Sequence, residues 1–151
     1  MANRDVDIRS ARGSDLGTVT QLDERHTGLA KPDYWAGLFV RCVEAPRPNR
    51  FFLVAESEGD VIGFVVGEIR TWEFGSPPCG WVFAINVVPG RREHGVGTAL
   101  MDAICERFRA AGANSVRTML LRRDTLNLAF FRSQGMIAGE YIQLEKMLNE
   151  G

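Results

Sequence analysis

Apolar residues follow two spacings along the chain, and together these spacings predict a mixed series of strands and helices. Alternating or continuous apolar runs predict strands at residues 6–10, 51–56, 61–70, 81–88 and 116–121. Helical spacing predicts a helix capped by Ser14, a second over residues 33–43, a third over 95–111 and a short one over 126–133. Residues 137–148 are expected to supply one or two final strands.

This order of elements predicts an α/β (α+β) fold. We expect a mixed, mostly antiparallel sheet of six to seven strands with helices on both faces. The run at 81–88 is apolar almost throughout, so it is expected to be a central strand covered on both sides. No internal repeat or linker interrupts the pattern, so residues 1–151 are expected to form a single domain.

Composition narrows the class of protein. Apolar residues make up 45% of the chain, charged residues 25%, and the formal net charge is −1. These values predict a globular protein with no general attraction to nucleic acid or to membranes. Three widely spaced cysteines (Cys42, Cys79 and Cys105) and two histidines favour a reducing, cytoplasmic location and no metal site.

The stretch from Ile85 to Thr98, I-N-V-V-P-G-R-R-E-H-G-V-G-T, is the strongest chemical signal. A strand here runs into a helix through glycines, and such a helix start offers unpaired N–H donors and a positive dipole end to a phosphate. A Walker loop is excluded because Gly97 is not followed by lysine, and a dinucleotide fingerprint is matched only in part.

The spacing V-x-P-x-x-R-x-x-G-x-G, at Val87, Pro89, Arg92, Gly95 and Gly97, resembles the pyrophosphate turn of the GNAT superfamily of acyl-CoA-dependent N-acetyltransferases. The resemblance extends from an I-R-x-A-x-x-x-D-L opening at residues 8–16, through V-I-G-F at 61–64, to F-F-R-S-Q-G-M at 130–136. It implies splayed central strands, with acetyl-CoA in the gap between the strand ending near residue 88 and the strand at 116–121.

The resemblance also implies which residues hold the acyl-CoA. Main-chain groups around Ile85 and Val87 would pair with the pantetheine, and the amides of residues 92–98 would hold the pyrophosphate. We expect His94 to contribute its backbone rather than act as a base, and Arg91 to lie either near the phosphates or on the solvated surface. The expected cofactor-binding residues are Ile85, Val87, Arg92, His94, Gly95, Val96, Gly97, Thr98, Asn127 and Phe131.

The acid–base residues usual in similar proteins are missing. Phe131 stands where many members carry a proton-donating tyrosine, and Met119 stands where one branch carries a glutamate base. Glu68, Glu73 and Tyr141 are the substitute catalytic candidates, although each also has a plain structural interpretation as a solvated or packed side chain.

The favoured interpretation is an N-acetyltransferase in which a primary amine attacks acetyl-CoA directly. The acceptor stays open between an amine-bearing small molecule, a protein N-terminus and a lysine. The alternative is a CoA-binding sensor or scaffold domain without transferase activity, because Met119 and Phe131 replace the usual pair. Trp72 and Phe74 lie in a loop rich in proline and glycine. They are expected to form a wall of the acceptor channel, to make a contact in a homodimer, or to pack within the loop itself.

Overall fold

The computed structural model describes residues 6–149, without the side chains of residues 92–94. The chain divides into two compact units, and the boundary along the sequence falls between Met119 and Leu120. The first unit contains β1 (Val6–Ser10), α1 (Leu16–Thr27), α2 (Pro32–Phe39), β2 (Arg50–Ser57), β3 (Asp60–Arg70), β4 (Cys79–Val87), α3 (Val96–Ala110) and β5 (Val116–Arg117). The second contains α4 (Thr125–Ser133). Within the described residues, no helix has the length and apolar character that a membrane crossing requires.

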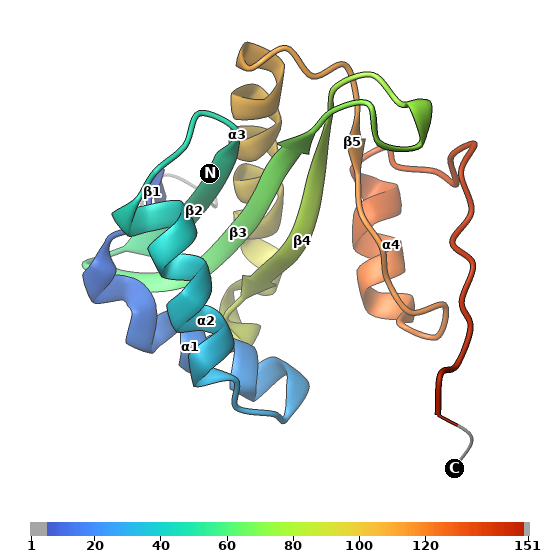
Figure 1. The fold of residues 1–151 in the computed structure, drawn as a ribbon. Coiled ribbons are helices and arrows are strands. Elements are labelled where there is room, and N and C mark those ends of the chain that lie inside the picture. Colours follow the sequence, from blue (N-terminus) through green and yellow to red (C-terminus); the bar gives the residue numbers. More distant parts are fainter. Residues whose placement is uncertain (1–5, 150–151) are drawn as a thin grey trace. The chain divides into compact units, whose positions relative to one another are not determined.

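The first unit is built on a five-stranded sheet in the order β1-β2-β3-β4-β5. Strands β1 to β4 pair antiparallel, and β5 adds to β4 in parallel. Helices α1 and α2 lie on one side of the sheet and α3 lies on the other (Figure 1). The predicted α+β class and the mixed sheet are therefore confirmed, but the described residues form five strands rather than six or seven.

The missing strands are those expected near the end of the chain. Residues 137–148 form no strand in the described part of the chain, and Ile137, Ile142, Leu144 and Leu148 are 82–90% exposed. Their apolar character suggested a buried strand face, but a strand also needs a neighbour that accepts and donates main-chain hydrogen bonds. For the same reason β5 covers two residues and not the whole run 116–121.

Aromatic side chains fill the core between the sheet and helices α1 and α2. Trp35 meets Phe64 edge to face with ring centroids 5.3 Å apart, and Phe39 meets Phe52 at 4.7 Å. Trp35 also donates its indole N–H to Asp23 Oδ2 at 3.0 Å, so the buried polar atom of this ring is satisfied. Pairs of this kind fix α2 against β2 and β3.

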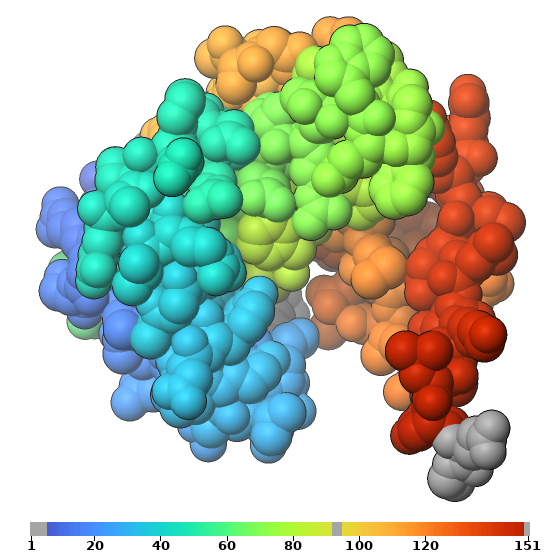
Figure 2. Space-filling model, viewed as in Figure 1, coloured from blue at the N-terminus to red at the C-terminus, as the bar shows by residue number. Residues whose placement is uncertain are grey.

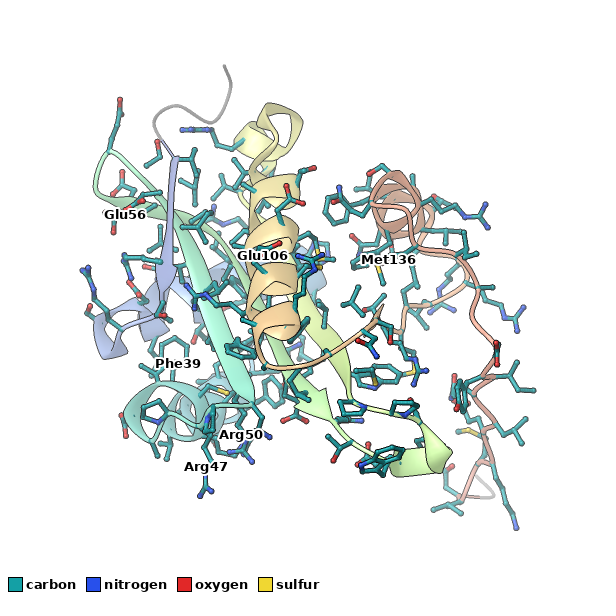
Figure 3. The ribbon with its side chains drawn as sticks, turned by 90° about the horizontal axis from the view of Figure 1, so that it is seen from above. Phe39, Arg47, Arg50, Glu56, Glu106 and Met136 are labelled. Carbon is teal, nitrogen blue, oxygen red and sulfur yellow. The ribbon has the colours of Figure 1, made fainter. Side chains whose placement is uncertain are left out.

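An ion-paired cluster joins β1, β2 and the start of α1. Arg9 donates from Nη1 and Nη2 to the two carboxylate oxygens of Asp15 at 2.8 and 3.1 Å, and from Nη2 to Glu56 at 2.8 Å. Asp15 also accepts the main-chain N–H of Arg12 at 2.8 Å. Helix α1 therefore begins after Asp15, one residue later than a cap at Ser14 would give. Figure 3 shows Arg50 and Glu56 near the two opposite ends of β2.

Glycines on β3 and β4 let α3 lie close to its face of the sheet. A methyl group added at Gly67 would stand 2.5 Å from the carbonyl oxygen of Trp81 and 2.7 Å from Phe108 Cζ. One added at Gly80 would overlap the Phe108 ring, and one at Gly63 would meet the carbonyl oxygen of Asn86 at 2.8 Å. The sheet can therefore accept α3 only where these side chains are absent.

We expect Gly67→Ala to lower the free energy of unfolding by about 1–3 kcal/mol, since the added methyl meets backbone and ring atoms in a filled core. Gly17→Ala is the matched control, because a methyl there meets nothing within 4 Å and the residue lies in α1. That substitution is expected to be neutral or to stabilise by up to about 1 kcal/mol. Urea denaturation of the two variants measures the difference; equal stability would show that α3 does not pack this closely.

Candidate functional site

Strand β4 contains one residue more than its partner. Val82 pairs with Gly67 and Ala84 pairs with Val66, so Phe83 is an extra residue between them. This is a β-bulge, which bends a strand and leaves the extra residue outside the ladder. Phe83 is also 40% exposed, although a strand covered on both faces was expected here.

The pairing of β4 with β5 ends at almost the same point as the bulge. Only Gly80 and Trp81 pair with β5, and the Thr118 hydroxyl then donates to the carbonyl oxygen of Val82 at 2.8 Å. Among the described residues, the edge of β4 from Phe83 to Asn86 has no strand partner on that side. The two neighbouring strands therefore separate, and main-chain groups along this edge are placed to pair with an extended ligand.

The open edge leads directly to the glycine turn. After β4, residues 89–94 form a 3-10 turn, Gly95 adopts φ +75°, and α3 begins at Val96. Ala99 N–H donates to the Gly95 carbonyl at 3.0 Å within the first turn of this helix. Amides at the start of such a helix point along its axis and not into its own ladder. The backbone therefore has the strand, glycine turn and helix start that the sequence predicts, and anion binding at this turn stays a prediction.

The structure gives the position of the main chain at each expected cofactor-binding residue of the first unit. Ile85 lies on the open edge and Val87 ends β4, while Val96, Gly97 and Thr98 form the first turn of α3. The Val96 side chain is fully buried, so only its main chain is accessible to a ligand. The side chains of Arg92 and His94 lie outside the described residues.

Three contacts anchor the turn to the rest of the first unit. Val88 N–H donates to the Ile62 carbonyl at 2.8 Å, and Arg91 Nη2 donates to Ser57 Oγ at 3.3 Å. Asn86, which is buried, donates from Nδ2 to the Leu22 carbonyl of α1 at 3.1 Å. Arg91 thus ties the turn to the end of β2. The role of Asn86 was missed because a single asparagine in an apolar run does not reveal its partner.

Glu68 lies on β3 opposite Trp81, two residues before the bulge in β4. Its Oε1 accepts from Arg70 Nε at 3.2 Å, and its Oε2 lies 3.7 Å from Arg50 Nε. Glu73 is exposed and lies 3.9 Å from the same Arg70 Nε. The two glutamates predicted as catalytic candidates are therefore both neighbours of the same arginine, Arg70.

A small pocket opens beside these charges, lined by Arg70, Glu73, Phe74, Ser76, Cys79, Trp81 and Arg117. Its interior measures about 10 Å³, enough for one water-sized group. Arg117 Nη1 donates to Ser76 Oγ at 3.0 Å and to Cys79 Sγ at 3.6 Å. Elsewhere in the first unit, burial raises the pKa of the Cys42 and Cys105 thiols, which disfavours their thiolate forms.

The second unit holds the remaining candidates. Asp124 accepts from the main-chain N–H of Asn127 at 3.1 Å and from its Nδ2 at 2.7 Å, which caps α4. Phe131 is the buried residue of this helix and meets Phe130 edge to face, while Tyr141 is 49% exposed. The roles of Asn127, Phe131 and Tyr141 at an acyl-CoA stay predictions.

Comparison with known proteins decides the family. The model of the family described as the acetyltransferase (GNAT) family matches residues 18–136. The chain belongs to the GNAT family. The match includes the open edge of β4, the glycine turn and α4, so the family that the motifs resemble is confirmed.

Known GNAT relatives give further context. The L-2,4-diaminobutyric acid acetyltransferase of Nocardia farcinica is 27% identical over 99 residues, which are 66% of this chain and 50% of that protein. The chain thus matches about half the length of this relative. Two solved structures share the fold: an aminoglycoside N-acetyltransferase, AAC(6')-Iy, in complex with CoA, and the aminoglycoside 6'-N-acetyltransferase AAC(6')-Ih from Acinetobacter baumannii.

The agreement with both structures spans nearly the whole chain. AAC(6')-Iy has a TM-score of 0.80 at 20% identity, covering 95% of each chain. AAC(6')-Ih has a TM-score of 0.81 at 16% identity, covering 97% of this chain and 99% of that one. At such identities the likeness establishes the GNAT fold alone.

Proposed function

We propose that this GNAT protein is an N-acetyltransferase that uses acetyl-CoA as donor and a primary amine as acceptor. One observation carries the proposal: the unpaired edge of β4 runs directly into a turn with a left-handed glycine, Gly95, at the start of α3. A linear ligand that ends in a pyrophosphate matches this combination of an extended edge and an anion-binding helix start.

The chain binds the donor mainly through its backbone in this proposal. Main-chain groups of Ile85 and Val87 pair with the pantetheine amides, while the amides of residues 95–98 surround the pyrophosphate. Hydrogen bonds to a charged group contribute about 1.5–3 kcal/mol each, so a few such amides account for useful affinity. Arg92 and His94 belong to the same turn and complete the proposed set.

In this proposal the reacting thioester lies at the bulge. Because Phe83 lies outside the ladder with β3, its main-chain groups are available to the thioester. A donor N–H aimed at the carbonyl oxygen stabilises the charge that develops when an amine attacks. The amine then forms the new bond to the carbonyl carbon, and the thiolate of CoA leaves.

The attacking amine must first lose a proton. At pH 7 this costs about 4–5 kcal/mol for a lysine-like amine and about 1–1.5 kcal/mol for an α-amine. In the first unit, Glu68 is the proposed proton acceptor, directly or through water, since it lies across from Trp81 and close to the bulge. Glu73 is a second candidate, and Tyr141 of the second unit is the candidate donor to the departing thiolate.

An amine-bearing small molecule is the acceptor that the comparisons favour. The names of the relatives specify diaminobutyric acid and aminoglycosides, both of which carry primary amines. A cytoplasmic location and a homodimer are parts of the same proposal that rest on the sequence alone.

Titration calorimetry with acetyl-CoA tests the donor site: we expect one binding site with a Kd well below 1 mM, and no heat at millimolar acetyl-CoA would contradict the proposal. A panel of primary amines, followed by release of free CoA thiol, then tests transfer. Amine-dependent release identifies an enzyme. Binding of acetyl-CoA without such release from any amine would instead favour the sensor or scaffold interpretation.

A further inference from the structure

The pocket at the start of β4 is separate from the turn that binds the donor. Its lining comes from the end of β3, the β3–β4 connection, the first residues of β4 and β5. Figure 2 shows the β3–β4 connection, in light green, standing out on the surface of the first unit. A group that enters the pocket therefore meets side chains that the donor site does not use.

Arg70 presents the most telling geometry in the pocket. Both of its contacts to carboxylates, with Glu68 and Glu73, go through Nε. Its guanidinium lies 5.6 Å from the centre of the Trp81 ring, which restrains the plane of the group. In the described part of the chain no hydrogen bond engages Nη1 or Nη2, so this pair of donors is left for an acceptor. Two parallel N–H donors of one guanidinium match the two oxygens of a carboxylate.

The charges around the pocket favour an anion. Arg70 and Arg117 line it together with Glu73, and the next charged contacts are Glu68 and Arg50. Both glutamates already have an arginine partner, since Arg70 contacts each of them. A second ammonium group would therefore meet carboxylates that are already paired, whereas a carboxylate would face the Nη groups of Arg70.

The loop beside the pocket is held in a conformation that bulky residues rarely adopt. Trp72 and Phe74 have φ values of +63° and +56°, and they are 68% and 83% exposed. Hydrogen bonds from Trp72 N–H to the Ser76 carbonyl at 2.6 Å and from Ser76 N–H to the Glu73 carbonyl at 3.0 Å maintain this geometry. Left-handed backbone at non-glycine residues is costly and is concentrated at ligand sites. Phe74 itself lines the pocket.

The pocket also lies at a useful distance from the proposed reaction. Trp81 precedes the bulged residue Phe83 by two positions, which in a strand corresponds to about 7 Å. Trp81 and Ala84 pair with Glu68 and Val66, so both lie on the sheet face covered by α1 and α2. A small acceptor can therefore place its amine near the bulge and a second polar group in the pocket.

We propose that this pocket is an acceptor subsite for a carboxylate, so that the preferred acceptors are amino acids whose reacting amine lies several bonds from the acid group. Arg70 binds the carboxylate through Nη1 and Nη2 at the mouth of the pocket, whose interior admits one carboxylate oxygen. Arg117 adds positive charge, and Phe74 and Trp81 flank the carbon chain outside it. The inference rests on the proposed acetyl transfer and names its substrate class.

Matched pairs of acceptors test the subsite, because removal of one carboxylate converts each amino acid into a diamine. The pairs are 2,4-diaminobutyrate with 1,3-diaminopropane, ornithine with 1,4-diaminobutane, and lysine with 1,5-diaminopentane. For at least one pair we expect kcat/KM with acetyl-CoA to favour the amino acid by at least about tenfold, the effect of a charge-assisted bidentate contact. Equal or better acetylation of every diamine would overturn the subsite and leave the transferase intact.

Variants then assign the preference to Arg70. Because Arg70 also contacts the proposed proton acceptor Glu68, the readout is the ratio of kcat/KM for the amino acid to kcat/KM for its diamine. Arg70→Gln should lower this ratio at least about tenfold, while Arg70→Lys should lie between. Arg109→Gln is the control, since Arg109 is an exposed arginine of α3 outside the pocket. An unchanged preference in Arg70→Gln would overturn the assignment.

A second readout separates the subsite from the chemistry. Calorimetry of the CoA-loaded protein with each amino acid and each diamine measures binding without transfer. If no amine releases CoA, the proposed transfer fails; amino-acid binding that Arg70→Gln abolishes would still support the subsite, and absence of such binding would overturn it as well.

Discussion

Gly95→Val is expected to weaken the binding of acetyl-CoA at least about tenfold. Gly95 adopts φ +75° where the turn enters α3, and a β-branched residue is strained in that region. Relief of the strain would rotate the amides of the first helical turn away from the pyrophosphate. A loss of about 1.4 kcal/mol in binding free energy already corresponds to a factor of ten. Titration calorimetry of the folded variant measures the change.

Gly112→Val provides a control with the same kind of strain at the other end of α3. Gly112 has φ +95°, and a side chain there meets nothing within 4 Å. This variant is expected to lose stability and to keep the affinity of the unmodified protein for acetyl-CoA. If both variants bound acetyl-CoA equally well, the turn at Gly95 would not be the pyrophosphate site.

Asp15→Asn is expected to lower the free energy of unfolding by about 2–4 kcal/mol, the range for breaking a largely buried ion pair. Asp15 is 5% exposed and accepts from Arg9 twice and from the Arg12 main chain. The amide removes the negative charge and leaves Arg9 with Glu56 alone. Thermal or urea unfolding at pH 7 measures the loss.

The same carboxylate makes stability depend on pH. Burial acts to raise the pKa of Asp15, but hydrogen bonds from Arg9 and Arg12 outweigh it and hold the pKa below its ordinary value. The folded state therefore binds fewer protons than the unfolded state, and the stabilisation is present above the unfolded pKa near 3.9. It is lost as the pH falls from about 4 through the folded value. Asp15→Asn should lack this component of the acid-induced loss.

Glu106→Gln distinguishes a buried ion pair from an exposed one. Glu106 pairs with Arg109 on the surface of α3, and both side chains are well exposed (Figure 3). Such pairs contribute about 0–1 kcal/mol, so little change is expected at any pH. If Glu106→Gln lowered the free energy of unfolding as much as Asp15→Asn does, burial would not be the reason that the Arg9–Asp15 contact is strongly stabilising.

Elements with strong periodicity could be predicted from the sequence. The hairpin of β2 and β3, with its apolar strands and a turn at residues 58–59, lies where the pattern placed it, and α3 ends within one residue of the prediction. The final strands could not be predicted correctly, because exposed apolar residues such as Ile142 and Leu144 have the same pattern as buried ones. The pattern of apolar residues does not show whether a neighbouring strand is available for pairing.

The glycine turn was more predictable from the sequence than the pocket at the start of β4. Glycines report backbone geometry directly, so Gly95 and Gly97 mark the turn. The pocket depends instead on Arg70, Trp81 and Arg117, which belong to three different strands and meet only through the register of the sheet. No local signal announces the left-handed backbone at Trp72 and Phe74 either, since these residue types usually avoid it.

The bulge at Phe83 has a consequence for how this family member can vary. The extra residue puts Asn86 on the α1 face and Val82 on the α3 face, which a regular alternation would not allow. Replacing the Phe83 side chain leaves this phase unchanged. Deleting the residue would move the side chains of one of the two neighbouring segments to the other face of the sheet. If the segment after the deletion moved, Asn86 would be buried against α3; if the segment before it moved, Trp81 would point toward that helix. Substitution of Phe83 is therefore expected to be tolerated, whereas deletion of the residue is not. Single-residue deletions at this point should be absent from functional descendants of this chain.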